Sequence, residues 1–151
     1  VAVEGEIERI KRTSNKQPTM SPNSSHLHTI VVSEADIDEM NHVNNVVYLQ
    51  YTQDTATAHW LSIASLELQE NVVWMVRRHE IDYLKQAVLG DTLHIKTWVG
   101  EYTAATWVRH YEIYRASNHQ LLVKAKSIWV PMDRHTLRLK RIEGELLECF
   151  R

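Results

Sequence analysis

Cysteine, glycine and proline are all scarce in this chain, and each shortage excludes a class of site. Cys149 is the only cysteine among 151 residues, so no disulfide forms within the chain and we expect a reducing compartment. Its position near the end is typical of a partly buried thiol, not of a nucleophile with a supporting base. The sequence has only four glycines and contains no glycine-rich phosphate loop.

A basic excess and a long apolar run are also missing. The net charge is −2 at pH 7 and the pI is near 6.5, which disfavours a general nucleic-acid binder. No apolar run approaches the ~18 residues of a membrane span, and the N-terminus lacks the compact apolar stretch of a secretory signal. We therefore expect a cytoplasmic protein whose partners include neither nucleic acid nor a membrane.

The nine histidines do not form a recognisable metal site. They lie on different predicted elements, and no cysteine or carboxylate stands at a ligand spacing from them. We expect no metal and no cofactor. Four tryptophans (Trp74, Trp98, Trp107 and Trp129) are interpreted as core or interface residues and not as ligand platforms.

The composition that remains is that of one globular domain. Hydrophobic residues make up 44% of the chain and charged residues 24%, enough for a real core. Residues 1–26 are polar and read as a flexible N-terminal extension, in which 4–11 could form one or two helical turns. Residues 27–151 are expected to form the domain.

The pattern in 27–151 predicts one long helix and several strands. A first strand over 27–33 precedes a helix from Asn45 to about Ile63, whose apolar first turns (Val46, Val47, Leu49, Tyr51) and small second half suit burial. Strands follow over 72–84, with an irregularity near Arg77, and over 92–99, 105–115 and 121–131, where Pro131 ends the last one; a short helix closes 143–151. Short turns at 89–91 and 117–119 require antiparallel pairing. The prediction is an α+β fold, with one long central helix wrapped by a curled antiparallel sheet of about five strands.

The segment before the helix carries the candidate chemistry. Asp36, Asp38 and His42 precede the Asn44-Asn45 pair at the helix start. The unpaired N–H groups of a helix N-terminus can stabilise the oxyanion of an acyl-transfer reaction, and an upstream carboxylate can act as nucleophile or general base. The alternative is structural, because Asp and Asn are also ordinary helix caps.

The order of these residues resembles a known family. Asp38, His42, Val43, Asn44, Asn45, Tyr48 and Leu49 reproduce the D-x-D-x-x-G-H-V-N-N-x-x-Y-L pattern of the 4-hydroxybenzoyl-CoA thioesterase family, which is also similar to plant acyl-ACP thioesterases. The likeness continues through 77–84, 89–93 and 98–101. It implies a hotdog fold, a dimer or dimer of dimers with its sites at the subunit interface, and hydrolysis of acyl-CoA thioesters without a metal.

The resemblance also assigns residue roles. Asp38 matches the catalytic carboxylate, Asn45 stands where a backbone N–H polarises the thioester carbonyl, and His42 matches a histidine of the plant enzymes. Asp36 is interpreted as a cap or turn residue. The candidate substrate-binding residues are Asn44, Val46, Tyr48 and Tyr51, which would shape the acyl site, and Arg77 and Arg78, which would meet the CoA phosphates.

Two departures from the pattern keep other functions open. Asn41 replaces the usual glycine, and asparagine is the residue best able to follow glycine into φ > 0. Gln53 stands where many relatives carry a glutamate, and Asp54 beside it points about 100° away. The alternatives are a non-catalytic acyl-CoA-binding or dimerisation module and a hotdog hydratase or dehydratase. Acyl-chain length, and CoA against carrier protein, stay undetermined at this level.

Overall fold

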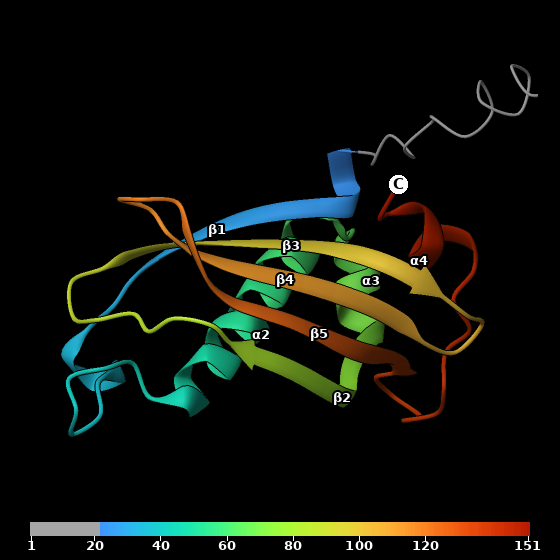
Figure 1. Ribbon diagram of the computed structural model, residues 1–151. Helices are drawn as coiled ribbons and strands as arrows, with labels where there is room; N and C mark the ends of the chain where they lie inside the picture. The colour runs from blue at the N-terminus through green and yellow to red at the C-terminus, as the bar shows by residue number, and fades with distance from the viewer. Residues whose placement is uncertain (1–21) are drawn as a thin grey trace, which may run out of the picture.

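The computed structural model describes residues 22–151, so the helical turns predicted for 4–11 lie outside the described residues. Figure 1 shows one sheet with a long helix against it. No helix among the described residues is long and apolar enough to cross a membrane. The elements are η1 Pro22–Ser24, β1 Ser25–Val31, η2 Glu34–Asp36, α2 Asn45–Ile63, α3 Leu66–Asn71, β2 Val72–Tyr83, β3 Thr92–Tyr102, β4 Trp107–Arg115, β5 Gln120–Asp133 and α4 Gly144–Glu148.

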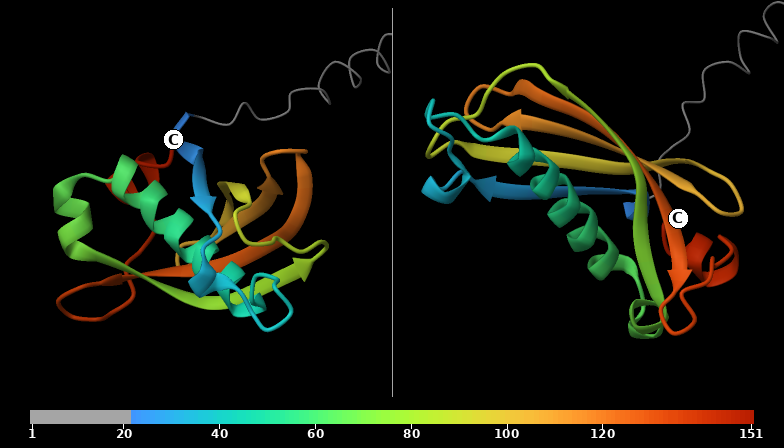
Figure 2. Two further views of the ribbon diagram at one scale, coloured as in Figure 1. Left: turned by 90° about the vertical axis from the view of Figure 1, so that its left-hand side faces the viewer. Right: turned by 90° about the horizontal axis from the view of Figure 1, so that it is seen from below.

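The five strands form one antiparallel sheet in the order β1-β3-β4-β5-β2. Because β1 and β2 stand at opposite edges, the chain must cross the whole sheet between them. Helix α2 makes that crossing along the inner face of the curl, as the two views of Figure 2 show. The predicted α+β arrangement of one long helix wrapped by about five antiparallel strands is confirmed.

Helix α2 has the predicted bounds and buries part of the predicted face: Tyr51 is buried as expected, but Val46 is not. Asn44 is its N-cap, with a side-chain oxygen that accepts from the Val46 N–H at 3.2 Å. Val46 itself is 72% exposed, although it was expected on the apolar face. The side chains that face the sheet recur at helical spacing and include polar ones: Tyr48, Tyr51, Thr52, Thr55, Ala56, His59 and Trp60. The apolar pattern alone does not predict the buried polar side chains, which are tolerated because a buried threonine can satisfy its own hydroxyl, as Thr55 does by donating to the Tyr51 carbonyl.

Two separate apolar clusters hold the two ends of α2. The cluster at its N-terminal half consists of Val32, Val43, Tyr48, Tyr51, Ala87, Leu93, Ile95, Ile113, Leu122 and Val123. The cluster at its C-terminal half consists of Trp60, Leu68, Val72, Trp107, Ile142, Leu146 and Phe150. The first cluster supports the candidate loop, while the second joins the C-terminal helix to the sheet.

Several strand ends differ from the prediction: β1 ends at Val31 and not at 33, and β4 begins at Trp107 and not at 105. β1 begins at Ser25, two residues early, and β3 continues to Tyr102. β5 passes through Pro131 and ends at Asp133. Proline is tolerated there because the Pro131 carbonyl accepts from the Lys140 N–H, so the N and O of Pro131 point away from its β2 partner Trp74 and no β2 ladder bond is lost.

Of two further local features, one was predicted from the sequence and the other was not. The irregularity predicted near Arg77 is confirmed, since the β2–β5 register shifts between Val76 and Arg78. The short helix α3 was missed. Its signal is Ser65, whose hydroxyl caps the helix by accepting from the Leu68 N–H at 3.2 Å.

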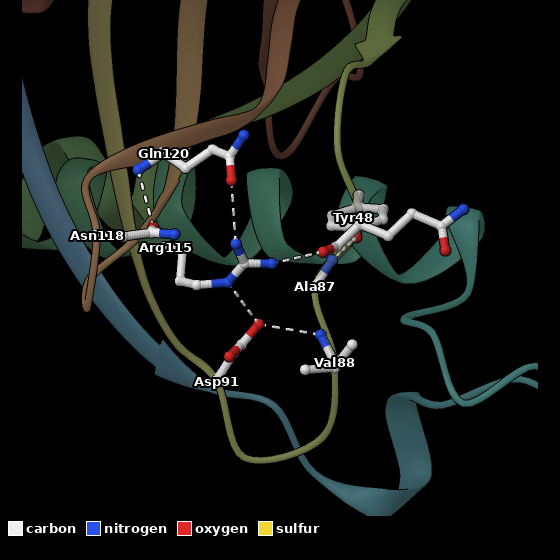
Figure 3. Close-up of polar contacts among 8 residues, drawn as sticks. Tyr48, Ala87, Val88, Asp91, Arg115, Asn118 and Gln120 are labelled. Atoms are coloured by element: carbon white, nitrogen blue, oxygen red, sulfur yellow. Dashed lines mark hydrogen bonds and ion pairs between the residues drawn. The ribbon is translucent and has the colours of Figure 1, made fainter.

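The buried backbone of Ala87 joins three parts of the fold. Ala87 has no exposed surface; its N–H donates to the Tyr48 hydroxyl at 2.9 Å, and its carbonyl accepts from the Val43 N–H at 3.0 Å. Figure 3 shows how the surrounding loop is tied down. There the Arg115 guanidinium donates to Asp91 Oδ2 at 3.0 Å and to the Gln86 carbonyl at 2.7 Å. Helix α2 and the loop before it are therefore held against the 84–91 segment.

We predict that Tyr48→Phe destabilises the protein by about 1–3 kcal/mol, because the buried Ala87 N–H loses its acceptor. Urea unfolding of the two proteins measures the difference. Tyr102→Phe is the matched control, since Tyr102 is 43% exposed, and it should change stability by less than about 0.5 kcal/mol. Equal stabilities for Tyr48→Phe and the wild type would contradict the role given to this hydrogen bond.

Candidate active site

The Asp38 carboxylate is fixed by its own loop. Asp38 Oδ1 accepts from the backbone N–H of Met40 at 2.9 Å and of His42 at 3.2 Å. The loop closes through the Asp38 N–H, which donates to the His42 carbonyl at 2.8 Å. These bonds leave Asp38 Oδ2 without a partner among residues 22–151. The half-buried carboxylate is thus oriented by backbone amides while one oxygen stays available.

Asn41 occupies the position where glycine is usual, and it adopts the conformation expected of glycine. Its φ is +62°, in the left-handed region. Its N–H donates to the Asp38 carbonyl at 3.1 Å, which completes the turn around the carboxylate. The expectation that asparagine can adopt φ > 0 at this position is confirmed, and asparagine is among the few residues that tolerate it.

Asp36 connects the loop to helix α2, and its contacts indicate a structural role, not a catalytic one. Its Oδ2 accepts from the Ser33 N–H at 3.1 Å and from the Tyr51 hydroxyl at 2.8 Å. Its carbonyl accepts from the Asn44 N–H at 2.9 Å. Burial and then the adjacent Asp36 carboxylate hold the pKa of Tyr51 well above its usual range, so Tyr51 stays a donor. The interpretation of Asp36 as a cap or turn residue agrees with these contacts.

The start of α2 offers one open backbone donor. The Val46 N–H donates to Asn44 Oδ1, and the Val47 N–H donates to the Asn44 carbonyl at 2.8 Å. Within residues 22–151 the Asn45 N–H makes no hydrogen bond, and it lies at the positive end of the helix dipole. This is the donor that the sequence singled out for a thioester carbonyl.

The structure gathers some of the predicted site residues and separates others. Asp38, His42, Asn44 and Asn45 share one loop–helix junction. Tyr48 and Tyr51 lie beneath it, buried, with their hydroxyls bound to the Ala87 N–H and to Asp36, and Val46 points to solvent. Arg77 and Arg78 are exposed on β2, where Arg78 lies 2.7 Å from Glu80, and no contact among residues 22–151 joins them to the loop.

Asp54 does not supply the carboxylate that is missing at Gln53 on α2. Gln53 is half-buried, whereas Asp54 is exposed and its Oδ1 accepts from the Gln50 side chain at 2.8 Å. The carboxylate nearest in sequence is therefore engaged on the outer surface of the helix.

A buried network of hydrogen-bonded side chains at the C-terminal end of α2 was not predicted from the sequence. His59 donates from Nε2 to the Asn23 carbonyl at 2.7 Å and accepts at Nδ1 from the Arg109 guanidinium at 2.9 Å. The same Arg109 nitrogen lies 3.1 Å from the Thr97 hydroxyl. The available signal was Arg109 itself, a charged residue at an inward-facing position of an alternating strand. No group of three or more His, Cys, Asp or Glu side chains in the described part of the chain could hold a metal ion.

Comparison with known families and proteins shows which proteins this chain is similar to. A family model described as the acyl-ACP thioesterase N-terminal domain matches residues 24–150. The chain is 26% identical over 103 residues to the acyl-[acyl-carrier-protein] hydrolase FATB3 of Cuphea viscosissima, a match that covers 62% of this chain and 25% of that protein. It is 26% identical over 117 residues to the long-chain acyl-CoA thioesterase FadM of Escherichia coli, covering 74% and 86% of the two chains. The chain thus spans about a quarter of the length of the plant relatives it matches.

Solved structures share the fold. A 1,4-dihydroxy-2-naphthoyl-CoA thioesterase from Synechocystis superposes with a TM-score of 0.73 at 20% identity, covering 83% of this chain and 95% of that one. The probable thioesterase YbaW from Escherichia coli gives 0.70 at 26% identity, covering 82% and 94%. The predicted hotdog fold is confirmed by these neighbours.

We predict that protonation of His59 makes stability depend on pH. Burial and then the Arg109 charge lower the pKa of His59 to about 4 from 6.5. The unfolded chain therefore binds the proton first, and stability that is complete above pH 6.5 is lost as the pH falls toward 4. The full shift corresponds to about 3 kcal/mol for this buried group.

Urea unfolding between these pH values measures the effect. His59→Gln should flatten the slope of stability against pH, whereas His135→Gln in an exposed turn should leave the slope as in the wild type. An unchanged slope in His59→Gln would rule out His59 as the titrating group.

Proposed function

The chain belongs to the acyl-ACP thioesterase N-terminal domain family, and on this basis we propose that it hydrolyses acyl thioesters. The observation that carries the proposal is the loop–helix junction, where an oriented Asp38 carboxylate and the open Asn45 N–H stand within one short segment. These are the two groups that thioester hydrolysis needs: one to activate or perform the attack, and one to stabilise the oxyanion.

The proposed reaction begins with the carbonyl oxygen of the thioester on the Asn45 N–H. Asp38 Oδ2 either takes a proton from water, which adds to the carbonyl carbon, or attacks that carbon itself to give a mixed anhydride that water then opens. Either route breaks the C–S bond, and the departing thiolate takes up a proton. The helix dipole of α2 favours the negative charge on the carbonyl oxygen.

His42 is proposed as a second catalytic candidate. Its backbone N–H and carbonyl both bond to Asp38, so the half-buried His42 is held next to Asp38 in the loop. Asn44 positions the helix start by capping it. We assign Tyr48 and Tyr51 a supporting place beneath the acyl site, since both hydroxyls already bind protein groups.

We propose acyl-CoA as the substrate form. The match to the long-chain acyl-CoA thioesterase FadM covers most of both chains, whereas the plant carrier-protein hydrolases match over about a quarter of their length. Arg77 and Arg78 are exposed on β2 and are proposed to meet the CoA phosphates. Acyl carrier protein is the competing acyl donor.

We further propose that the protein works as a homo-oligomer, a dimer or a dimer of dimers. Exposed apolar side chains surround the candidate site: Met40 is 73% exposed, Val46 72% and Val88 41%. Val88 pairs with His42 through a backbone bridge, so this patch is continuous with the loop. Exposed apolar patches beside a site mark interaction surfaces, and a second copy would cover this one.

Replacing Asp38 tests the role of the carboxylate. Asp38→Asn keeps an oxygen that can accept from Met40 and His42 but removes the charge, so kcat for acyl-CoA hydrolysis should fall by about 10²–10⁴-fold while the fold persists. Free-thiol release from short, long and aromatic acyl-CoAs measures it.

The matched control is Asp54→Asn, an exposed carboxylate on α2, which should keep wild-type turnover. Turnover in Asp38→Asn equal to that of the wild type would contradict the proposed mechanism. The altered Gln53 position favours one alternative, a non-catalytic acyl-CoA-binding module, and binding without thiol release from any thioester would establish it.

The mass of the protein in solution tests the proposed assembly. Light scattering at micromolar concentration should give at least twice the chain mass of 17.7 kDa, and Val88→Glu should lower the mass because it places a charge in the apolar patch. Leu137→Glu, an equally apolar exposed site in the turn after β5, is the control and should keep the oligomer. A wild-type monomer would contradict this proposal.

A further inference from the structure

A cavity of about 220 Å³ lies at the C-terminal half of α2, in the half of the fold away from the Asp38 loop. It is bordered by α2, by four of the strands and by Phe150, and its walls are mostly apolar or aromatic. Four of the five tryptophans line it, namely Trp60, Trp74, Trp107 and Trp129. Trp74, Trp107 and Trp129 were interpreted as core or interface residues, and the structure shows that they also line a cavity. Thr57 and Arg134 in the lining are exposed, so the cavity reaches the surface.

Arg109 brings a positive charge into this apolar lining. It is only 6% exposed, and its guanidinium donates to His59 and to Thr97 and stacks over the Phe150 ring at 5.8 Å. Both hydrogen-bond partners are neutral, since the pKa of His59 lies at about 4. No carboxylate within residues 22–151 pairs with this arginine. A buried cation without a counter-charge is costly, and an anionic ligand would offset that cost.

A second donor in the lining also lacks an acceptor. Trp74 Nε1 is buried and has no hydrogen-bond partner in the described part of the chain. Arg134 adds a further positive charge, held by the Gln69 carbonyl at 3.1 Å. The lining contains no aspartate or glutamate. A cavity with two arginines, an unused indole N–H and no acid matches a ligand with acceptor oxygens and negative charge.

We propose that this cavity binds an organic carboxylate with a short aliphatic or aromatic body. The carboxylate accepts from Arg109 and from Trp74 Nε1, and the body packs against the remaining indole rings. The volume suits a small ligand, because pockets for drug-sized molecules are larger, about 300–1,000 Å³.

This site is distinct from the Asp38 loop. Ala56, the first lining residue on α2, stands eleven residues beyond Asn45, which corresponds to roughly 16 Å along the helix. Carboxylate binding therefore does not depend on the proposed hydrolysis, and failure of one leaves the other standing. The carboxylate has two possible sources: a free acid, or the far end of an acyl group that carries a terminal carboxyl.

The direct test is equilibrium binding followed by tryptophan fluorescence, since four of the five indoles line the cavity. We expect hexanoate and benzoate to change the emission, and hexanamide and benzamide, their neutral counterparts, to bind about tenfold more weakly or worse. Equal binding of the acid and the amide, or no binding of either acid at millimolar concentration, would overturn the proposal.

Variants identify the groups responsible. Arg109→Gln should remove the preference for acid over amide, and Arg109→Lys should retain part of it. Because Arg109→Gln also disturbs His59, Trp74→Phe provides a milder test and should weaken hexanoate about severalfold by removing the Nε1 donor. Arg141→Gln, an exposed arginine outside the cavity, is the control and should bind as the wild type. An acid preference intact in both Arg109→Gln and Trp74→Phe would place the ligand elsewhere.

Two thioesters separate the sources. If the carboxylate is the far end of an acyl group held at the Asp38 loop, the acyl chain must span roughly 16 Å, so tetradecanedioyl-CoA should compete with hexanoate for the cavity. Tetradecanoyl-CoA, which lacks the terminal carboxylate, should compete about tenfold more weakly or worse. If neither thioester competes while hexanoate still binds, the ligand is a free acid. The readout in both arms is displacement, and the Asp38→Asn protein can be used so that hydrolysis does not interfere.

Discussion

The buried backbone of Ala87 is the constraint on which the candidate active site depends. Its carbonyl holds the Asp38 loop through the Val43 N–H, and its N–H holds α2 through the Tyr48 hydroxyl. Since neither group can reach water, the loss of either bond leaves a buried polar group unsatisfied. The orientation of Asp38 relative to the start of α2 therefore rests on a tyrosine that need not touch the substrate.

Helix α2 serves two different environments. At its N-terminal end the neighbouring loop provides a carboxylate and the helix itself provides an open N–H, in a setting with exposed apolar side chains around it. At its C-terminal end it provides His59 and Trp60 to a region of tryptophans and a buried arginine. The two ends have separate apolar clusters, so a ligand at one end need not disturb the packing at the other.

The fold and the loop were largely predictable because their signals are local. The bounds of α2, the bulge near Arg77 and the positive φ of Asn41 all follow from residues close together in sequence. Helix α3 was missed although its signal, the Ser65 cap, is local, but the other misses have non-local causes. β5 continues through Pro131 because a later segment supplies the Lys140 N–H, and the buried face of α2 includes polar side chains that face the sheet. Arg109 was unremarked because its partners come from distant elements.

The sequence by itself determined the α+β class, the long helix and the position of the candidate carboxylate before it, since caps, turns and alternation act within a few residues. Tertiary structure alone decided which tyrosines support the loop and which tryptophans border a cavity with Arg109. The physical reason is that burial and hydrogen bonding depend on what another strand or helix brings to the same place. A residue's own type and spacing do not contain that information.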